Sequence, residues 1–265
     1  EVNNYVIKEM ENFDNFQKSF QDSDRKEIYR NKKNDRIEIL KKLKQETKYL
    51  HYLTIEQILG IKYFYDITKR IPRKEIEKME KYLQIIVKAI NPKFKILCCG
   101  SYRRGRPDSG DMDCLLTHKQ LLTKTECEAF EAEKGSPLKL LKQILTDLGF
   151  LTDHLTDNEK TKYMGLCKLP HNKYTTHRRI DIRFVPYHSY GAALLYFTGS
   201  QNFNTEMRKI AIDKGYTLNE YGLFKTVYDP KTKKKIKGDQ IPTITEKDIF
   251  DQLNMEYKTP KERDI

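Results

Sequence analysis

The chain has 265 residues, of which 38% are hydrophobic and 33% charged, and its 50 lysines and arginines exceed its 38 acidic residues by a formal net charge of +12. This composition is that of a folded globular protein, and the positive charge favours a polyanionic partner such as nucleic acid. No apolar run approaches the roughly 18 residues of a membrane helix and the start lacks a secretory signal, so we expect an intracellular protein that is neither secreted nor membrane-bound.

The cysteines form neither a disulfide framework nor a zinc site. Their number is odd, and no two of them have CxxC spacing. They are Cys98, Cys99, Cys114, Cys127 and Cys167. We expect them to be small core residues in a reducing compartment.

The first third of the chain is expected to be entirely helical. Residues 1–53 are highly charged, contain no glycine or proline, and show helical spacing of apolar residues in RIEILKKLKQETKYL, which predicts solvent-exposed helix. Residues 54–93 open with Thr54 and Gln57 at capping-box spacing and continue as two helices separated by Pro72.

The hydrophobic period changes at residue 94, and a sheet is expected from there to about residue 186. Four stretches are typical of strands, FKILCCGSY, DMDCLLTH, TKYMGLCKL and RRIDIRFVP, and a helix is expected at about 137–149. Beyond the sheet we expect a helix over 204–214 and a hairpin over 228–242. The lysine run KTKKKIKG in this hairpin fits a solvated turn better than a phosphate-binding patch.

Two aspartates on the second strand stretch indicate a cation site. Side chains at positions i and i+2 of a strand project from the same face, so Asp111 and Asp113 should lie side by side. A cation between two carboxylates relieves their repulsion, and hard divalent ions such as Mg²⁺ prefer such oxygen ligands together with phosphates.

A third aspartate can complete this site. Asp181 is flanked by Ile180 and Ile182, which should point into the core while the aspartate points away. If its strand lies beside that of Asp111, three carboxylates converge and can bind two metal ions about 3.5 to 4 Å apart, the arrangement used in phosphoryl and nucleotidyl transfer.

The segment that precedes the aspartates suits a polyphosphate. Glycines let backbone N–H groups approach phosphate oxygens, a serine adds a hydroxyl donor, and guanidinium groups match phosphate geometry. The residues concerned are Gly100, Ser101, Gly105, Gly110, Arg103, Arg104 and Arg106. Each signal alone is common, but their combination with the aspartates on one turn and strand is not.

The GS, basic turn and DxD of CCGSYRRGRPDSGDMDCLLTH are the signature of the nucleotidyltransferase superfamily, and this stretch resembles the palm of the X-family DNA polymerases, with a pattern closest to DNA polymerase beta. Further segments resemble the family in the same order, and the resemblance covers residue 54 to the end. These segments are 60–76, 177–186, 194–224 and 245–264.

The resemblance implies an α+β fold built on a nucleotidyltransferase palm with a mixed sheet. A charged helical region (1–53) and a helical, fingers-like subdomain (54–93) precede the palm (94–186). A small α/β subdomain that binds the nascent base pair (187–265) follows it. The family's lyase domain and helix-hairpin-helix loop have no recognisable counterpart in the first region.

The resemblance also assigns roles to single residues. It makes Asp111, Asp113 and Asp181 the ligands of two Mg²⁺ ions, with Mn²⁺ as an alternative, and Asp181 also the acceptor of the primer 3′-hydroxyl proton. The nucleotide-binding positions are the triphosphate contacts Gly100, Ser101, Arg104 and Gly110, the sugar contacts Tyr196, Phe197 and Gly199, and the base contact Asn204. The DNA-binding positions are Arg179, Arg208 and Tyr221, the last of which also senses the closed state.

Two positions depart from polymerase beta. Gln201 replaces an acidic residue near the base, and Thr205 replaces a lysine that stacks on the template, so affinity and fidelity are expected to differ.

The implied activity is template-directed filling of short gaps by a monomer that acts on gapped or primed DNA with dNTP substrates. The expected location is the nucleus, another DNA-containing compartment or a virus. The alternatives are a template-independent, terminal-transferase-like enzyme and a catalytically inactive DNA-binding subunit.

Overall fold

The computed structural model describes residues 54–156, 160–170, 176–231 and 233–265. Its contacts divide the chain into two units, Glu1–Lys62 and Tyr63–Ile265, which are described separately. The expectations for residues 1–53 lie outside the described residues.

The described part of the first unit is helix α3 (Ile55–Lys62) with its cap. The Thr54 amide donates to Oε1 of Gln57 at 2.9 Å, and the Gln57 amide donates to Oγ1 of Thr54 at 3.3 Å. These reciprocal bonds satisfy two backbone donors that a helix start leaves unpaired, which confirms the predicted capping box.

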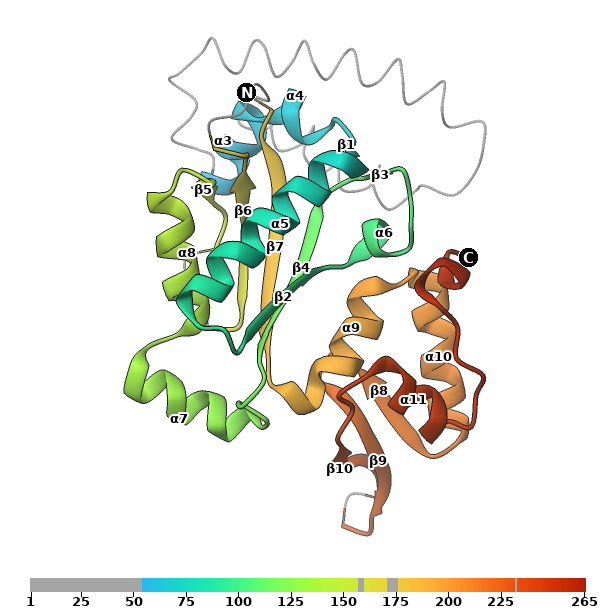
Figure 1. Cartoon of the computed structure of the whole chain (residues 1–265). Coiled ribbons are helices and arrows are strands. Elements are labelled where there is room, and N and C mark those ends of the chain that lie inside the picture. Colours follow the sequence, from blue (N-terminus) through green and yellow to red (C-terminus); the bar gives the residue numbers. More distant parts are fainter. Residues whose placement is uncertain (1–53, 157–159, 171–175, 232) are drawn as a thin grey trace, which may run out of the picture. The chain divides into compact units, whose positions relative to one another are not determined.

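The second unit is built on a five-stranded mixed sheet (Figure 1). Strands β4 and β7 are parallel and the other neighbouring pairs are antiparallel. In sheet order the strands are β2 (Phe94–Cys98), β4 (Met112–His118), β7 (Arg178–Val185), β6 (Lys162–Cys167) and β5 (Leu151–His154). The predicted sheet and the α+β class are confirmed.

Helices α5 (Arg73–Ile90) and α8 (Pro137–Asp147) cover one face of this sheet (Figure 1). Helix α5 buries residues at helical spacing, as an amphipathic helix does when it packs on a sheet. Ile180 and Ile182 of β7 belong to the same core, so alternation turns Asp181 to the other face, as predicted.

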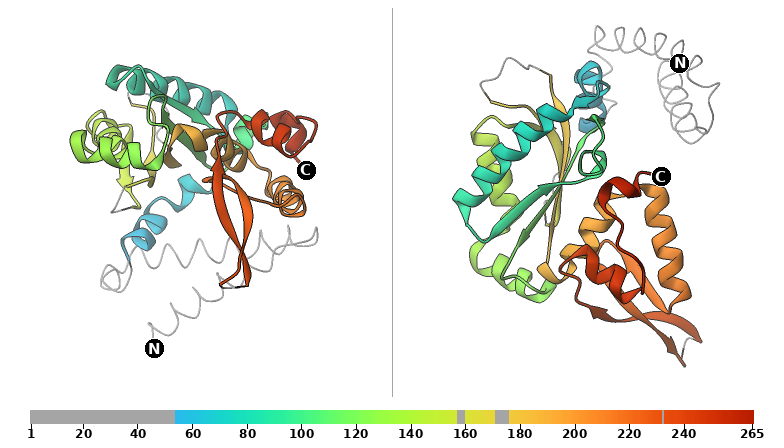
Figure 2. Two further views of the ribbon diagram at one scale, coloured as in Figure 1. Left: turned by 90° about the horizontal axis from the view of Figure 1, so that it is seen from below. Right: turned by 45° about the vertical axis from the view of Figure 1, so that its right-hand side comes forward.

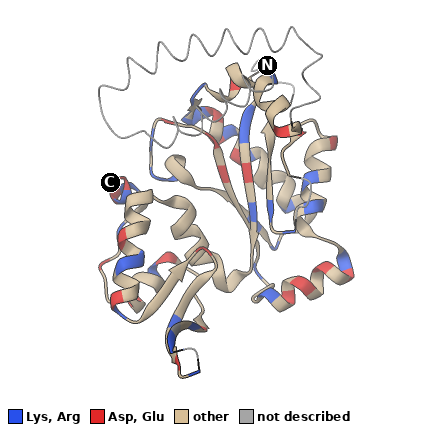
Figure 3. Ribbon diagram, turned by 180° about the vertical axis from the view of Figure 1, so that it is seen from behind, with Lys and Arg blue, Asp and Glu red and all other residues tan. Residues whose placement is uncertain are grey.

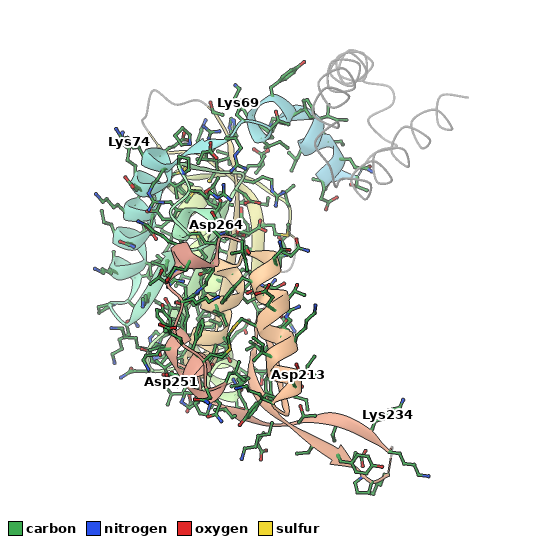
Figure 4. The ribbon with its side chains drawn as sticks, turned by 90° about the vertical axis from the view of Figure 1, so that its right-hand side faces the viewer. Lys69, Lys74, Asp213, Lys234, Asp251 and Asp264 are labelled. Carbon is green, nitrogen blue, oxygen red and sulfur yellow. The ribbon has the colours of Figure 1, made fainter. Side chains whose placement is uncertain are left out.

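The C-terminal part has its own hydrophobic core. Its helices and strands are coloured orange to red in Figure 2. Helices α9 (Tyr190–Thr198), α10 (Gln201–Asp213) and α11 (Glu246–Gln252) accompany a three-stranded antiparallel sheet. Its strands are β8 (Tyr216–Asn219), β9 (Gly222–Asp229) and β10 (Lys234–Ile241), and a short 3₁₀ helix, η3 (Pro260–Arg263), follows. Strands β9 and β10 form the predicted hairpin, with Lys234 at its far end (Figure 4).

Several local expectations were wrong. The first third contains a strand, β1 (Ile71–Pro72), because its backbone pairs with β3 (Asp108–Ser109), a partner that local sequence does not reveal. The stretch FKILCCGSY, expected to be a strand, is a strand only as far as Cys98, and a one-turn helix, α6 (Gly100–Arg103), follows. The predicted helix over 204–214 starts earlier, at Gln201, because Ser200 caps it by accepting from the Phe203 amide. The helix predicted before Pro72 is divided into α3 and α4 (Phe64–Ile67). Helices α7 (Lys124–Lys134) and α9, and the 3₁₀ turn η2 (Tyr187–Ser189), were not anticipated.

All five cysteines are free thiols, four of them buried and Cys127 half-buried, as expected. In the described ranges, no helix combines the length and apolar character needed to cross a bilayer.

Candidate active site

The candidate site begins where the chain turns after β2. Helix α6 starts at Gly100, whose φ of +58° is a backbone conformation that residues with a side chain rarely adopt. A Cβ atom at Gly100 would lie 2.8 Å from Oδ2 of Asp113. The Cys99 amide donates to the Asp113 carbonyl at 2.6 Å, which ties the turn to β4. Glycine therefore lets the turn approach the carboxylate closely.

Parallel pairing of β4 and β7 brings two of the predicted aspartates together. Asp113 and Asp181 are direct register partners, so their side chains project from the same face of the sheet. Acidic positions on these adjacent strands are visible side by side in Figure 3. Asp111 lies one residue before β4 begins and two residues before Asp113.

The carboxylates of Asp113 and Asp181 are not fully balanced by neighbouring positive charge. Loss of hydration, followed by the charges of Asp111 and Asp181, raises the pKa of Asp113 to about 7. Burial also raises the pKa of Asp181, although Arg179 opposes this shift. Oδ1 of Asp181 is buried without a hydrogen-bond partner. Such an uncompensated buried oxygen is costly, and a divalent cation is a group that can compensate it.

Arg179 lies next to the carboxylates. Its Nη2 atom is 3.5 Å from Oδ2 of Asp111 and 3.8 Å from Oδ2 of Asp181. Over the ranges described, no three histidine, cysteine, aspartate or glutamate side chains are already arranged to hold one metal ion. The Arg179 guanidinium thus lies close to the carboxylates of both Asp111 and Asp181.

A cleft of about 1030 Å³ opens beside Asp111 and Asp113. Its lining includes eleven predicted site residues from the turn, β4, α9 and α10. They are Gly100, Ser101, Arg104, Gly110, Asp111, Asp113, Tyr196, Phe197, Gly199, Asn204 and Arg208. Asp181, Arg179 and Tyr221 are not part of this lining. The Tyr221 side chain is exposed, in the turn between β8 and β9.

Contacts within the cleft hold several polar side chains in place. Nη1 of Arg104 donates to the Thr198 carbonyl at 2.7 Å. Nδ2 of Asn204 donates to the Tyr196 carbonyl at 2.7 Å, and the Arg208 guanidinium lies 5.1 Å from the centre of the Tyr196 ring. A cation over an aromatic face is attracted to it, so Tyr196 restrains both α10 residues.

Arg70 and Thr198 line the cleft but were not singled out from the sequence. Arg70 and Arg106 add positive charge to the lining, and Thr198 supplies the carbonyl that binds Arg104. Arg70 directly precedes β1, and the pairing of β1 with β3 places it at the cleft. An ion pair with Asp108, at 2.8 Å, holds its side chain there. This placement depends on a long-range contact. Arg106, in contrast, was already visible in the basic turn.

Two protein-family models match most of the second unit. The family model of the DNA polymerase beta palm matches residues 70–187, and the family model of the DNA polymerase beta thumb matches residues 193–264. The chain belongs to the X family of DNA polymerases. The X-family resemblance inferred from the sequence is thereby confirmed.

Curated X-family relatives include DNA polymerase lambda of Rattus norvegicus, 38% identical over 225 residues that cover 83% of this chain and 37% of that protein. DNA polymerase lambda of Arabidopsis thaliana is 34% identical over 223 residues, 80% of this chain and 40% of its own length. DNA nucleotidylexotransferase of Xenopus laevis is 30% identical over 238 residues, which cover 80% of this chain and 44% of that protein. The chain thus spans about two fifths of the length of these relatives.

Proposed function

We propose that the chain is a template-directed DNA polymerase that adds a deoxynucleotide to a primer 3′-hydroxyl. The substrates are dNTP and gapped or primed DNA, the proposed role is short-gap filling in repair, and the protein acts as a monomer in a DNA-containing compartment such as the nucleus. The observation that carries the proposal is the in-register pairing of Asp113 and Asp181 beside a cleft that also holds Arg104. Relatives named DNA polymerase lambda support it.

The three aspartates fit a divalent metal. Their oxygens, the raised pKa of Asp113 and the orphaned Oδ1 of Asp181 indicate a site that needs positive charge, and Asp111, Asp113 and Asp181 would hold it. Divalent metal use is general in this family, and we propose two Mg²⁺ ions, with Mn²⁺ as an alternative. When bound, such ions neutralise charge on the phosphates and favour attack at phosphorus.

Asp181 is the proposed acceptor of the primer 3′-hydroxyl proton. Burial raises its pKa, which makes its carboxylate a stronger base than an exposed aspartate. The alkoxide formed in this way attacks the α-phosphate of the dNTP, and pyrophosphate leaves. Positioning of primer and dNTP by the chain supplies much of the rate enhancement.

The cleft residues bind the nucleotide in this proposal. Gly100, Ser101, Arg104 and Gly110 bind the triphosphate through backbone N–H groups, a hydroxyl and a guanidinium. The sugar lies against Tyr196, Phe197 and Gly199, where a 2′-hydroxyl finds little room. Asn204 contacts the minor-groove edge of the base, where correct pairs present nearly the same acceptors, so the contact tests the shape of the pair.

The remaining residues contact DNA. Arg179, already beside Asp181, binds a primer phosphate, and Arg208 contacts the template strand. Tyr221 is exposed, and it acts only when the C-terminal part closes on the nascent pair. Gln201 and Thr205 line the cleft at the two positions that depart from polymerase beta.

The test is single-nucleotide incorporation into a duplex with a one-nucleotide gap, with each dNTP supplied alone. We expect incorporation of the complementary nucleotide only, in the presence of Mg²⁺. Asp181→Ala should abolish incorporation and leave DNA binding nearly unchanged, whereas primer extension by this variant at a comparable rate contradicts the assignment. Comparing gaps with and without a downstream 5′-phosphate shows whether the chain recognises that group.

The same experiment separates the alternatives. Extension of a single-stranded primer by any dNTP, in preference to gapped duplex, would favour terminal transfer, the activity named for the Xenopus relative. Binding of DNA without incorporation under any divalent metal would instead favour an inactive DNA-binding subunit.

A further inference from the structure

Asp264, near the end of the sequence, contacts the arginine that we assign to the triphosphate. Nε of Arg104 lies 2.9 Å from Oδ1 of Asp264, and the two side chains are only 16% and 20% exposed. Arg106 forms an ion pair with the other oxygen, Oδ2. One carboxylate therefore bridges two arginines of the basic turn, and charge-assisted hydrogen bonds of this kind are stronger than neutral ones.

The backbone on both sides of this carboxylate is anchored. The preceding residue, Arg263, is fully buried and binds the buried Glu246. The Ser200 amide donates to the Arg263 carbonyl at 3.1 Å, and the Ser200 hydroxyl donates to the Ile265 carbonyl at 2.9 Å. A carboxylate on such a fixed support can orient a flexible partner.

Arg104 has the geometry of an oriented side chain. Its Nε atom contacts Asp264, and its Nη1 atom donates to the carbonyl of the fully buried Thr198. Within the described chain nothing accepts from its Nη2 group, and the residue lines the cleft. Holding two nitrogens of a guanidinium reduces the rotamer entropy that nucleotide binding must otherwise remove.

We propose that Asp264 is a positioning residue that fixes Arg104 for binding of a nucleotide triphosphate, an inference that rests on the proposed function. The group of Arg104, Arg106 and Asp264 keeps one net positive charge, so it still attracts the triphosphate. Asp264 touches neither the substrate nor the reacting atoms. It acts on nucleotide affinity through Arg104.

The first experiment compares Asp264→Asn with a matched control, Asp251→Asn. Asp251 pairs with Lys247 on the exposed surface of α11, and Figure 4 shows it at the opposite end of the C-terminal part from Asp264. On gapped DNA we expect Asp264→Asn to raise the KM for the dNTP about tenfold with kcat within about twofold, as for partners that orient a ligand-binding side chain. Asp251→Asn should change neither value by more than about twofold.

A double-mutant cycle tests whether the effect passes through Arg104. In an Arg104→Ala background, Asp264→Asn should raise the KM by less than about twofold, because the side chain that it positions is gone. A tenfold effect that persists in this background overturns the inference. An unchanged or lowered KM for Asp264→Asn alone also overturns it, and a lowered value would identify Asp264 as an anion that competes with the nucleotide.

A measurement of dNTP binding in the absence of incorporation separates this inference from the proposed function. Affinity for a dNTP with Ca²⁺ on gapped DNA should fall about tenfold in Asp264→Asn, while affinity for the DNA stays within about twofold. A wild-type chain that binds the dNTP but never incorporates it contradicts the proposed function and leaves the role of Asp264 measurable. A wild-type chain that binds no dNTP contradicts both.

Discussion

Asp113 and Asp181 lie directly opposite each other on the adjacent parallel strands β4 and β7. Two carboxylates at this spacing, with Asp111 nearby and one orphaned oxygen, destabilise the metal-free protein, because each disfavours the charge of the others. Functional sites commonly have such a cost in stability.

The pKa of Asp113 predicts how the stability of the metal-free protein depends on pH. Between its unfolded value of 3.8 and its folded value of about 7, the folded chain binds more protons at this group than the unfolded chain does. This contribution to the free energy of unfolding is therefore greatest below pH 4 and falls as pH rises to about 7. Urea unfolding in EDTA from pH 5 to pH 8 measures it.

Asp113→Asn provides the control for this pH dependence. The variant has no proton to lose and gains no negative charge at this position, so its stability should fall less over the same pH range. At pH 7.5 without metal it should exceed the wild type by up to about 4 kcal/mol, because the shift of about three pKa units corresponds to about 1.4 kcal/mol per unit, while incorporation is lost. A variant less stable than wild type at pH 7.5 contradicts this account.

Divalent metal should bind more tightly as the carboxylates lose their protons. Mg²⁺ at millimolar concentration should raise the melting temperature more at pH 7.5 than at pH 5.5, because binding needs ionised ligands. Differential scanning fluorimetry with and without EDTA measures this shift. Equal shifts at both pH values, or an undiminished shift in Asp113→Asn, would argue against binding at these aspartates.

Gly100→Ala should damage the site more than the fold. The positive φ should cost about 1 kcal/mol of stability, and the added Cβ should push the Asp113 carboxylate away, with at least a tenfold loss of kcat. Gly149→Ala is the matched control, because its φ is +70° and no atom lies within 4 Å of the point that a Cβ would occupy. It should lose similar stability and keep full activity in the gap-filling assay.

Glu246→Gln should destabilise the contact between the turn after β2 and the C-terminal part. Glu246 accepts two hydrogen bonds from Arg103, at 2.8 and 2.7 Å, and also binds Arg263. Burial alone would raise the pKa of Glu246, but the arginines outweigh burial and lower it. Removing this buried charge leaves two arginines uncompensated, and we expect a loss of about 3 kcal/mol in urea unfolding.

Glu256→Gln tests whether that loss is specific. Glu256 is exposed and lies close in sequence to α11, and the substitution makes the same chemical change as Glu246→Gln. The free energy of unfolding of the Glu256→Gln variant should remain within about 0.5 kcal/mol of the wild type. If both variants lose the same stability, the buried arginine pairs are not the cause.

The sequence by itself determined which side chains of β7 face the core and to which family the chain belongs. Alternation placed Ile180 and Ile182 inside and Asp181 outside. The spacing of Asp111 and Asp113 predicts a shared face, and the structure places Asp111 one residue before β4. Periods of two and 3.6 residues are local properties, so such placements can be predicted without knowledge of the partners. The X-family signature added the roles that we propose for single residues.

Only the tertiary structure decided which distant segments meet. The parallel register of β4 with β7, Arg179 among the aspartates, and Asp264 on Arg104 all join residues far apart in the sequence. Strand β1 was missed for the same reason, because its partner lies beyond α5. Which segments pair depends on the summed packing and hydrogen bonding of the whole unit, and no local pattern contains that sum.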